Sequence, residues 1–182
     1  MTAELETQIK NLQYFLSEFF RYGLVVQGKA YNLPGKYTID EFYHSIDPLD
    51  FHEFKVGICW DYVAYEDFVF RSFYKTVKYK LYYIESEDGR THTFLVYWKN
   101  DKPVLFEALL RGCRGCFEFK NIKELFTFIV NKHFQNHKQK SYFILEYNQP
   151  NEYGMTSKEF MDYVTSTGKL RMKNGLLYEN VK

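Results

Sequence analysis

The sequence has few cysteines and no long apolar run, and each shortage excludes a class of protein. Three cysteines among 182 residues is a small and odd number, so a disulfide framework is not expected. The first residues, MTAELETQIK, have no apolar stretch behind a basic start, which argues against a secretory signal. No apolar run approaches the roughly 20 residues of a membrane span. We therefore expect a cytoplasmic protein whose thiols stay reduced.

An excess of charge of one sign is also missing. The chain has 24 Lys and Arg against 23 Asp and Glu, for a net charge of +1, and the basic residues are dispersed. This lacks the basic footprint of a nucleic-acid binder, so neither nucleic acid nor a membrane is expected as a partner. Aromatic residues, in contrast, make up 20% of the chain. They fit a core filled with rings, and an aromatic-lined substrate groove is the alternative.

The apolar spacing predicts an α+β organisation in a single domain over residues 1–182. We expect a core at about 36–147, an N-terminal helix at 4–22 and a C-terminal helical appendage at 150–182. Further helices are predicted from the Thr38 capping box to Asp47-Pro48, from Cys59 to about Arg71, from Ile122 to His133, and after the Thr156 capping box. Strands are predicted at 76–85, 91–98, 104–110 and 141–147, the first three as an antiparallel meander.

Cys59 is the candidate nucleophile. It follows Gly57 and Ile58 and stands where the first turn of a buried helix is predicted. A lone cysteine is usually a small buried hydrophobe. At a helix N-terminus, however, the partial positive charge stabilises a thiolate, which can attack an amide carbonyl. Gly57 would allow backbone to come close to the group that is attacked.

A nucleophilic cysteine needs a base, and His92 is the best candidate. It opens a strand dense in apolar residues, where it is either a core histidine with satisfied nitrogens or a general base and acid facing Cys59. His44 is expected on the predicted second helix and His52 in a loop, both at the surface.

Glu107 is the candidate for the third group. If the turn before Pro103 places that residue opposite Trp98, then Glu107 becomes a diagonal neighbour of His92 on the same face of the sheet. A carboxylate there can fix the imidazole tautomer and stabilise imidazolium. A slip of one residue would turn Glu107 to the opposite face.

This order of cysteine at a helix start, histidine on the following hairpin and acid on the next strand resembles the transglutaminase-like superfamily. The segments Gly57–Asp61, Thr91–Tyr97 and Phe106–Glu107 resemble those of a group of bacterial transglutaminase-like proteins. The resemblance covers roughly residues 36–135 and departs from the superfamily in having Glu107 where Asp is usual. It implies a papain-like fold, with a central helix bearing the cysteine packed on an antiparallel sheet that bears the histidine and the acid.

The resemblance also implies a function. Members include protein cross-linking enzymes, cysteine proteases, peptide N-glycanases and inactive binding modules, so the fold does not choose the substrate. We expect a cysteine-nucleophile amide hydrolase or acyl transferase that acts on a protein or peptide through Cys59, His92 and Glu107. No metal or organic cofactor is implied. A catalytically inactive interaction module is the alternative, motivated by the substituted acid and by the absence of an evident oxyanion donor.

The remaining signals are weaker. Cys113 and Cys116 form a lone CxxC, which could support redox chemistry but lacks the second pair of a zinc site and the βαβ setting of a thioredoxin-like site. We interpret them as two unpaired thiols. His133 and His137 are spaced to share a helical face, but no further metal ligand stands out.

Two other polar residues, one upstream of Cys59 and one just after it, bear on the predicted site. Gln27 is a possible oxyanion donor, by analogy with the upstream glutamine of papain-like enzymes. Asp61 is interpreted as a charge at the helix start rather than as a catalytic group.

Overall fold

A computed structural model describes residues 1–133 and 141–178 of the chain. In chain order its elements are α1 (Ala3–Phe19), β1 (Arg21–Val26), β2 (Lys29–Asn32), α2 (Ile39–Phe42), α3 (Pro48–Phe54), β3 (Val56–Gly57), α4 (Cys59–Phe73), β4 (Tyr79–Ser86), β5 (Thr91–Lys99), β6 (Lys102–Glu107), β7 (Gly115–Glu118), α5 (Ile122–His133), β8 (Tyr142–Tyr147), α6 (Ser157–Thr167), β9 (Lys169–Lys173) and β10 (Leu176–Leu177). The chain is therefore α+β, as predicted.

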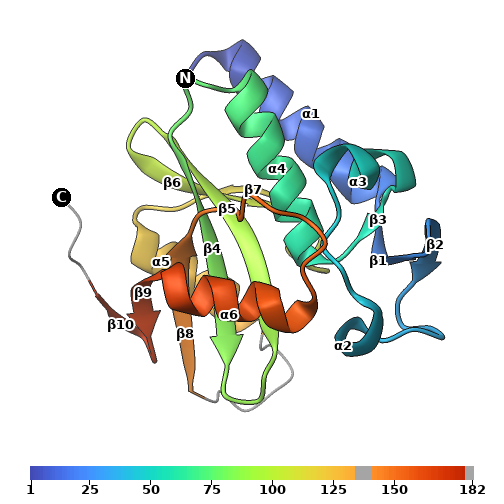
Figure 1. Cartoon of the computed structure of the whole chain (residues 1–182). Helices are drawn as coiled ribbons and strands as arrows, with labels where there is room; N and C mark the ends of the chain where they lie inside the picture. The colour runs from blue at the N-terminus through green and yellow to red at the C-terminus, as the bar shows by residue number, and fades with distance from the viewer. Residues whose placement is uncertain (134–140, 179–182) are drawn as a thin grey trace.

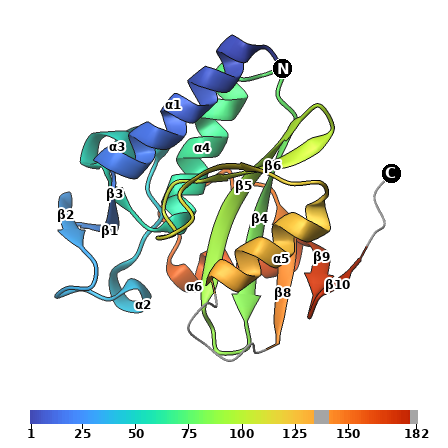
Figure 2. The same ribbon diagram turned by 180° about the vertical axis from the view of Figure 1, so that it is seen from behind.

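Within the described residues, the main sheet has seven antiparallel strands in the order β10-β9-β8-β4-β5-β6-β7. Its two faces are both covered, by α1, α4 and α6 on one side and by α5 on the other (Figures 1 and 2). Side chains alternate between these layers, so that Leu81 and Tyr83 of β4 enter the first core while Tyr82 and Ile84 enter the second. Most of the aromatic residues fill these two cores.

A small second sheet, in the order β2-β1-β3, lies beside the N-terminal end of α4. Strand β1 runs parallel to β3, with Tyr22 opposite Gly57. This pairing brings the segment after α1 next to the residues that immediately precede Cys59. The small sheet therefore forms one side of the region around the predicted nucleophile.

Helix α4 begins at Cys59, as the sequence predicted, and a buried carboxylate caps it. The Oδ2 atom of Asp61 accepts a hydrogen bond from the N–H of Ile58 at 2.9 Å, and its Oδ1 atom accepts one from the Tyr43 hydroxyl at 2.9 Å. Gly57 makes room for this cap, because a Cβ atom there would lie 2.8 Å from the Asp61 Cβ atom. The glycine thus serves the packing around the start of α4.

The predicted helix from Ile39 to Ile46 is wrong, since only the single turn of α2 forms. The Thr38 hydroxyl bonds the Glu41 carboxylate at 3.0 Å and does not cap the backbone. Beyond the turn the chain is extended, and His44 forms an isolated bridge with Thr156. In the extended segment Tyr43 is buried in the core, and its hydroxyl donates to Asp61, the cap of α4. A helix over the same residues would carry Tyr43 away from this position.

The Asp47-Pro48 pair, predicted to end a helix, instead begins one. The Asp47 carboxylate caps the N–H of Leu49 at 2.8 Å, and Pro48 occupies the first position of α3. Proline suits that position because its missing N–H would be unpaired there in any case. His52 consequently lies on α3 and not in a loop.

The segment after Gly168 forms β9 and β10, which extend the main sheet beyond β8. Strand β7 likewise adds an edge that the sequence did not predict. No helix in the described ranges is both long and apolar enough to cross a membrane.

Candidate active site

The structure brings Cys59, His92 and Glu107 together at one end of the main sheet. Cys59 is the first residue of α4, and its small exposed part lines a cleft. His92 lies near the start of β5 and Glu107 at the end of β6, and both are buried. Three segments far apart in the sequence therefore supply the three residues that the sequence predicted.

His92 and Glu107 form a buried charged pair. The Nε2–H of His92 donates to Oε2 of Glu107 at 2.8 Å. The predicted register holds, because Trp98 pairs with Pro103 and Leu95 with Phe106. Glu107 is thus the diagonal neighbour of His92 that this register requires.

The imidazole lies between the carboxylate and the thiol. Nε2 is taken by Glu107, which leaves Nδ1 for the side-chain interaction between His92 and Cys59. Burial opposes the charged ring, but the Glu107 charge, the interaction with Cys59 and the hydrogen bond with Glu107 outweigh it and raise the pKa of His92 to about 10. Burial likewise opposes the Glu107 anion, yet His92 and two backbone N–H groups hold the pKa of Glu107 below its usual value. The imidazolium form is therefore favoured at neutral pH.

The end of the β5–β6 ladder explains how α4 reaches His92. Paired residues stop at Leu95 and Phe106, so the two strands are no longer joined at the level of His92. Residues two apart in a strand share a face, so His92 lies on the same face of the sheet as Phe94, the face that α5 covers. The centroids of the two rings are 6.3 Å apart. Cys59 comes from the opposite layer and meets the ring where β5 and β6 are no longer paired with each other.

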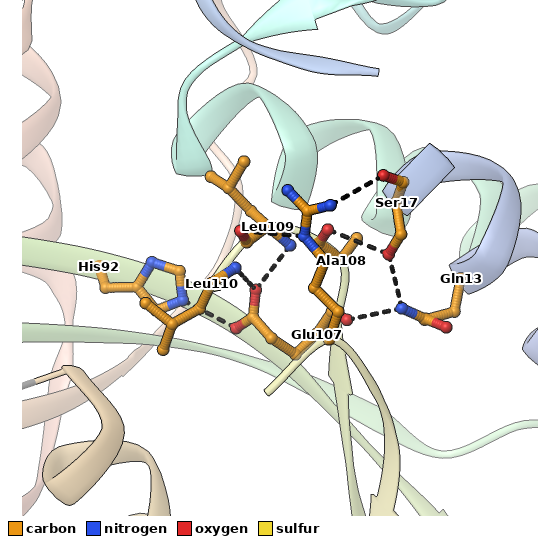
Figure 3. A network of polar contacts seen from close by, with 8 residues as sticks. Gln13, Ser17, His92, Glu107, Ala108, Leu109 and Leu110 are labelled. Carbon is orange, nitrogen blue, oxygen red and sulfur yellow. Dashed lines mark hydrogen bonds and ion pairs between the residues drawn. The ribbon is translucent and has the colours of Figure 1, made fainter. Parts of the chain in front are cut away.

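Glu107 is held in place from two directions, as Figure 3 shows. Its Oε1 atom accepts hydrogen bonds from the N–H groups of Leu109 and Leu110, both at 2.8 Å. Its own carbonyl accepts from Nε2 of Gln13 at 2.8 Å, and the same Gln13 nitrogen donates to Ser17. Helix α1 therefore fixes the turn that orients the carboxylate.

A second acid lies behind these three residues. Glu66, one of the buried residues of α4, lies two turns after Cys59, and its Oε2 atom has no hydrogen-bond partner among the residues that the structure describes. A cavity of about 10 Å³, lined by Cys59, Glu66, Thr93 and Glu107 among others, adjoins it. Burial and then the charge of Glu107 hold the pKa of Glu66 well above its usual value. Glu66 therefore keeps its proton to higher pH than an ordinary glutamic acid does, and the cavity is about large enough for one water molecule.

Tyr22 is the residue near the nucleophile that the sequence did not predict. It lines the cleft on both sides of Cys59, and its hydroxyl makes no hydrogen bond within the described residues. Partial burial, then the charges of Cys59 and Asp61, raise the pKa of Tyr22, which keeps its proton available for donation. Gln27, the donor considered from the sequence, lies in the β1–β2 turn with φ of 51° and does not line the cleft.

The CxxC thiols lie away from this cleft. Cys113 is buried in the core against α5, whereas Cys116 packs against the opposite core. Burial raises the pKa of both thiols to about 12. The two side chains thus face different layers, which does not favour a redox pair.

The other histidines are accounted for as follows. His52 shares a hydrogen bond with the Tyr65 hydroxyl at 2.8 Å, and the His133 ring stacks on His92 with the centroids 5.5 Å apart. His137 lies outside the described residues. Within residues 1–133 and 141–178, no three His, Cys, Asp or Glu side chains are grouped so that they could hold a metal ion.

Comparison with protein-family models, with curated proteins and with solved structures found no match.

Proposed function

We propose that this protein is a cysteine-nucleophile enzyme of the transglutaminase-like type, with a papain-like fold, that cleaves or transfers an acyl group from an amide of a protein or peptide. The observation that carries the proposal is the position of His92, hydrogen-bonded to Glu107 through Nε2 and facing Cys59 at the start of α4. Nucleophile, base and orienting acid then stand in the relation that amide chemistry requires. The α+β arrangement of α4 on the main sheet supports the same proposal.

The first half of the reaction forms a thioester. His92, as the imidazolium, holds the proton that the Cys59 thiol gives up, and the sulfur attacks the carbonyl carbon to give a tetrahedral oxyanion. The N–H of Cys59 has no acceptor within its own helix, because it belongs to the first residue of α4. Together with the Tyr22 hydroxyl it can stabilise the oxyanion. His92 then protonates the leaving amine as the C–N bond breaks.

The second half resolves the thioester. A water molecule gives a carboxylic acid and restores the thiol, whereas a second amine gives a new amide. His92 removes a proton from either nucleophile and returns it to the Cys59 sulfur as the C–S bond breaks. Glu107 stays ionised throughout and stabilises the imidazolium.

The experiment is alkylation of each thiol by iodoacetamide as a function of pH, with the modified peptides identified by mass spectrometry. An ordinary thiol reacts mainly near and above its pKa of about 8.5. We expect Cys59 to react rapidly well below pH 8. In a second measurement, protein that is incubated with an amide substrate and quenched in acid should carry an acyl group on Cys59. Ordinary reactivity and no acyl-enzyme would favour the interaction module instead.

A further inference from the structure

One half of the cleft beside Cys59 is rich in arginine. Arg21, Arg111 and Arg114 all line a cavity of about 850 Å³ that also contains Cys59 and His92. They form no ion pair with any described acidic residue. We call this set of three residues the arginine half. Since the whole chain carries a net charge of only +1, this is a local concentration of positive charge.

The three arginines differ in what they do for the protein. Arg114 donates to the carbonyl groups of Ser17 at 3.1 Å and Leu109 at 3.4 Å, so it also supports the turn after Glu107. Arg21 and Arg111 are exposed and make no side-chain hydrogen bond within the described residues. Their guanidinium groups are therefore available to a ligand.

The other side of Cys59 is of different character. A neighbouring cavity of about 590 Å³ also reaches Cys59, and its apolar lining includes Tyr37, Ile39, Trp60 and Met161. We call these four residues the apolar half. Asp40 and Arg90 also line this cavity, and Arg90 forms an ion pair with Asp88 at 2.6 Å. The apolar half therefore lacks the excess of positive charge that the arginine half carries.

We propose that the cleft recognises a polypeptide segment with acidic side chains on one side of the reacting amide and apolar side chains on the other. Because both cavities contain Cys59, a chain lying across the cleft would present its amide to the sulfur between the two halves. Guanidinium groups bind carboxylates through charge-assisted and often bidentate hydrogen bonds. Glu18 also lines the arginine half, but it is one carboxylate against three guanidinium groups. This inference rests on the proposed function, since it names the substrate class of the same site.

The test is equilibrium binding to the full-length Cys59→Ala variant, followed by fluorescence anisotropy. The probes are short fluorescein-labelled peptides in which a Leu-Phe pair and a Glu-Glu pair flank a central Gln-Gly, made in both orders. Matched peptides replace Glu-Glu by Gln-Gln or Lys-Lys, or replace Leu-Phe by Ser-Ser. In a second protein variant, Cys59→Ala is combined with Arg21→Glu and Arg111→Glu. These substitutions reverse two charges and leave the backbone contacts of Arg114 in place. Lys123→Glu, a single charge reversal at an exposed position of α5 outside the cleft, is the control for a change of charge elsewhere on the protein.

Of the two sequence orders, one Glu-Glu peptide should bind more tightly than the other. We expect that peptide to bind at least about tenfold more tightly at low salt than the Gln-Gln peptide of the same order. Salt should weaken this preference, because the cleft charges are exposed. The double Arg variant should lose the preference or bind the Lys-Lys peptide best, whereas Lys123→Glu should keep the wild-type order. Equal affinity for the three charge types, or no binding of any peptide, would overturn the inference.

The two proposals fail in different ways. If acidic peptides bind Cys59→Ala but wild-type Cys59 never forms an acyl-enzyme, the chemistry is wrong while the recognition stands. If wild type turns over amides without regard to their charge, the chemistry stands and the acidic substrate class is wrong.

Discussion

The Nε2 atom of His92 and the Oε2 atom of Glu107 lie 2.8 Å apart, with both side chains buried. The other carboxylate oxygen is occupied by the N–H groups of Leu109 and Leu110. The carboxylate can therefore rotate little, and it presents one fixed acceptor to the imidazole. This geometry determines which ring nitrogen carries the proton in the neutral state, and leaves Nδ1 to act toward Cys59.

Glu107→Gln should disable the base while leaving the shape of the site. If the amide oxygen keeps the two backbone N–H groups, the amide NH₂ faces Nε2 of His92 and forces that nitrogen to accept. The proton then resides on Nδ1, the nitrogen that must take the thiol proton. We expect turnover to fall by about 10²- to 10⁴-fold, as when the acid of a comparable triad is replaced. Initial rates with a cleaved peptide measure this.

The same variant should change the pH dependence of the site. Glu107 helps to raise the pKa of His92 from 6.5 to about 10, so losing the anion lowers that pKa. The stability that this raised pKa contributes is fully present below about pH 6.5 and is lost as pH rises toward 10. Wild type should therefore lose more stability across this range than Glu107→Gln.

Glu118→Gln on β7, which breaks an exposed pair with Lys102, is the control and should change stability by only about 0–1 kcal/mol. If both variants keep wild-type turnover, Glu107 is not the orienting acid.

Tyr22→Phe tests the oxyanion donor. Removing one such donor typically costs about 10²- to 10³-fold in kcat, and we expect a loss in this range with little change in KM. The rate of Cys59 alkylation should stay the same, because alkylation of a thiolate creates no oxyanion. Tyr37→Phe, in the same cleft but in the apolar half, is the matched control. A similar loss in both variants would mean that the hydroxyl groups act in substrate binding.

The three thiols should differ sharply in reactivity. Cys59→Ala should abolish both rapid alkylation and turnover while the fold survives. Cys113→Ala with Cys116→Ala should keep both, because burial raises the pKa of these thiols to about 12 and they lie outside the cleft. Alanine suits these half- or fully buried positions better than serine, whose hydroxyl would need a partner. Fast labelling of Cys116 in wild type, or inactivity of the double variant with Cys59 intact, would instead indicate redox chemistry.

The sequence predicted the parts of the site that depend on local patterns. The apolar run after Cys59 predicted α4, and the four-residue turn predicted the register that brings Glu107 to His92. What it missed depends on tertiary contacts. Tyr22 enters the site only because β1 pairs with β3, and two-residue strands such as β3 have no periodicity of their own.

The errors around Asp47 have the same physical origin. An Asp-Pro pair can end one helix or begin the next, and the burial of Tyr43 against Asp61 favours the second outcome. Strand β9 was missed for a related reason. Its side chains are mostly exposed apart from Met172, so it lacks the alternating apolar pattern of a half-buried strand.

Glu66→Gln should stabilise the protein increasingly as pH rises. In the folded protein, burial and the Glu107 charge raise the pKa of Glu66 well above 4.5. The unfolded chain releases that proton near its ordinary pKa of about 4.3. Between the two values folding must take up a proton, so wild type loses up to about 1.4 kcal/mol of stability per pH unit from this group. Glutamine has the same shape and no proton to take up.

Urea denaturation at pH 5 and pH 7 measures the effect. The difference in unfolding free energy between Glu66→Gln and wild type should be larger at pH 7 by at least about 1.4 kcal/mol, which corresponds to one pH unit of proton uptake. Glu53→Gln, at an exposed position on α3, also replaces a glutamate by glutamine. It should change the unfolding free energy by the same amount at pH 5 and at pH 7. The increment should shrink in a Glu107→Gln background, because the anion that helps to keep Glu66 protonated is gone. Parallel stability curves for wild type and Glu66→Gln would mean that Glu66 is already ionised in the folded protein. The pair of Glu66 and Glu107 would then carry two negative charges beside one imidazolium.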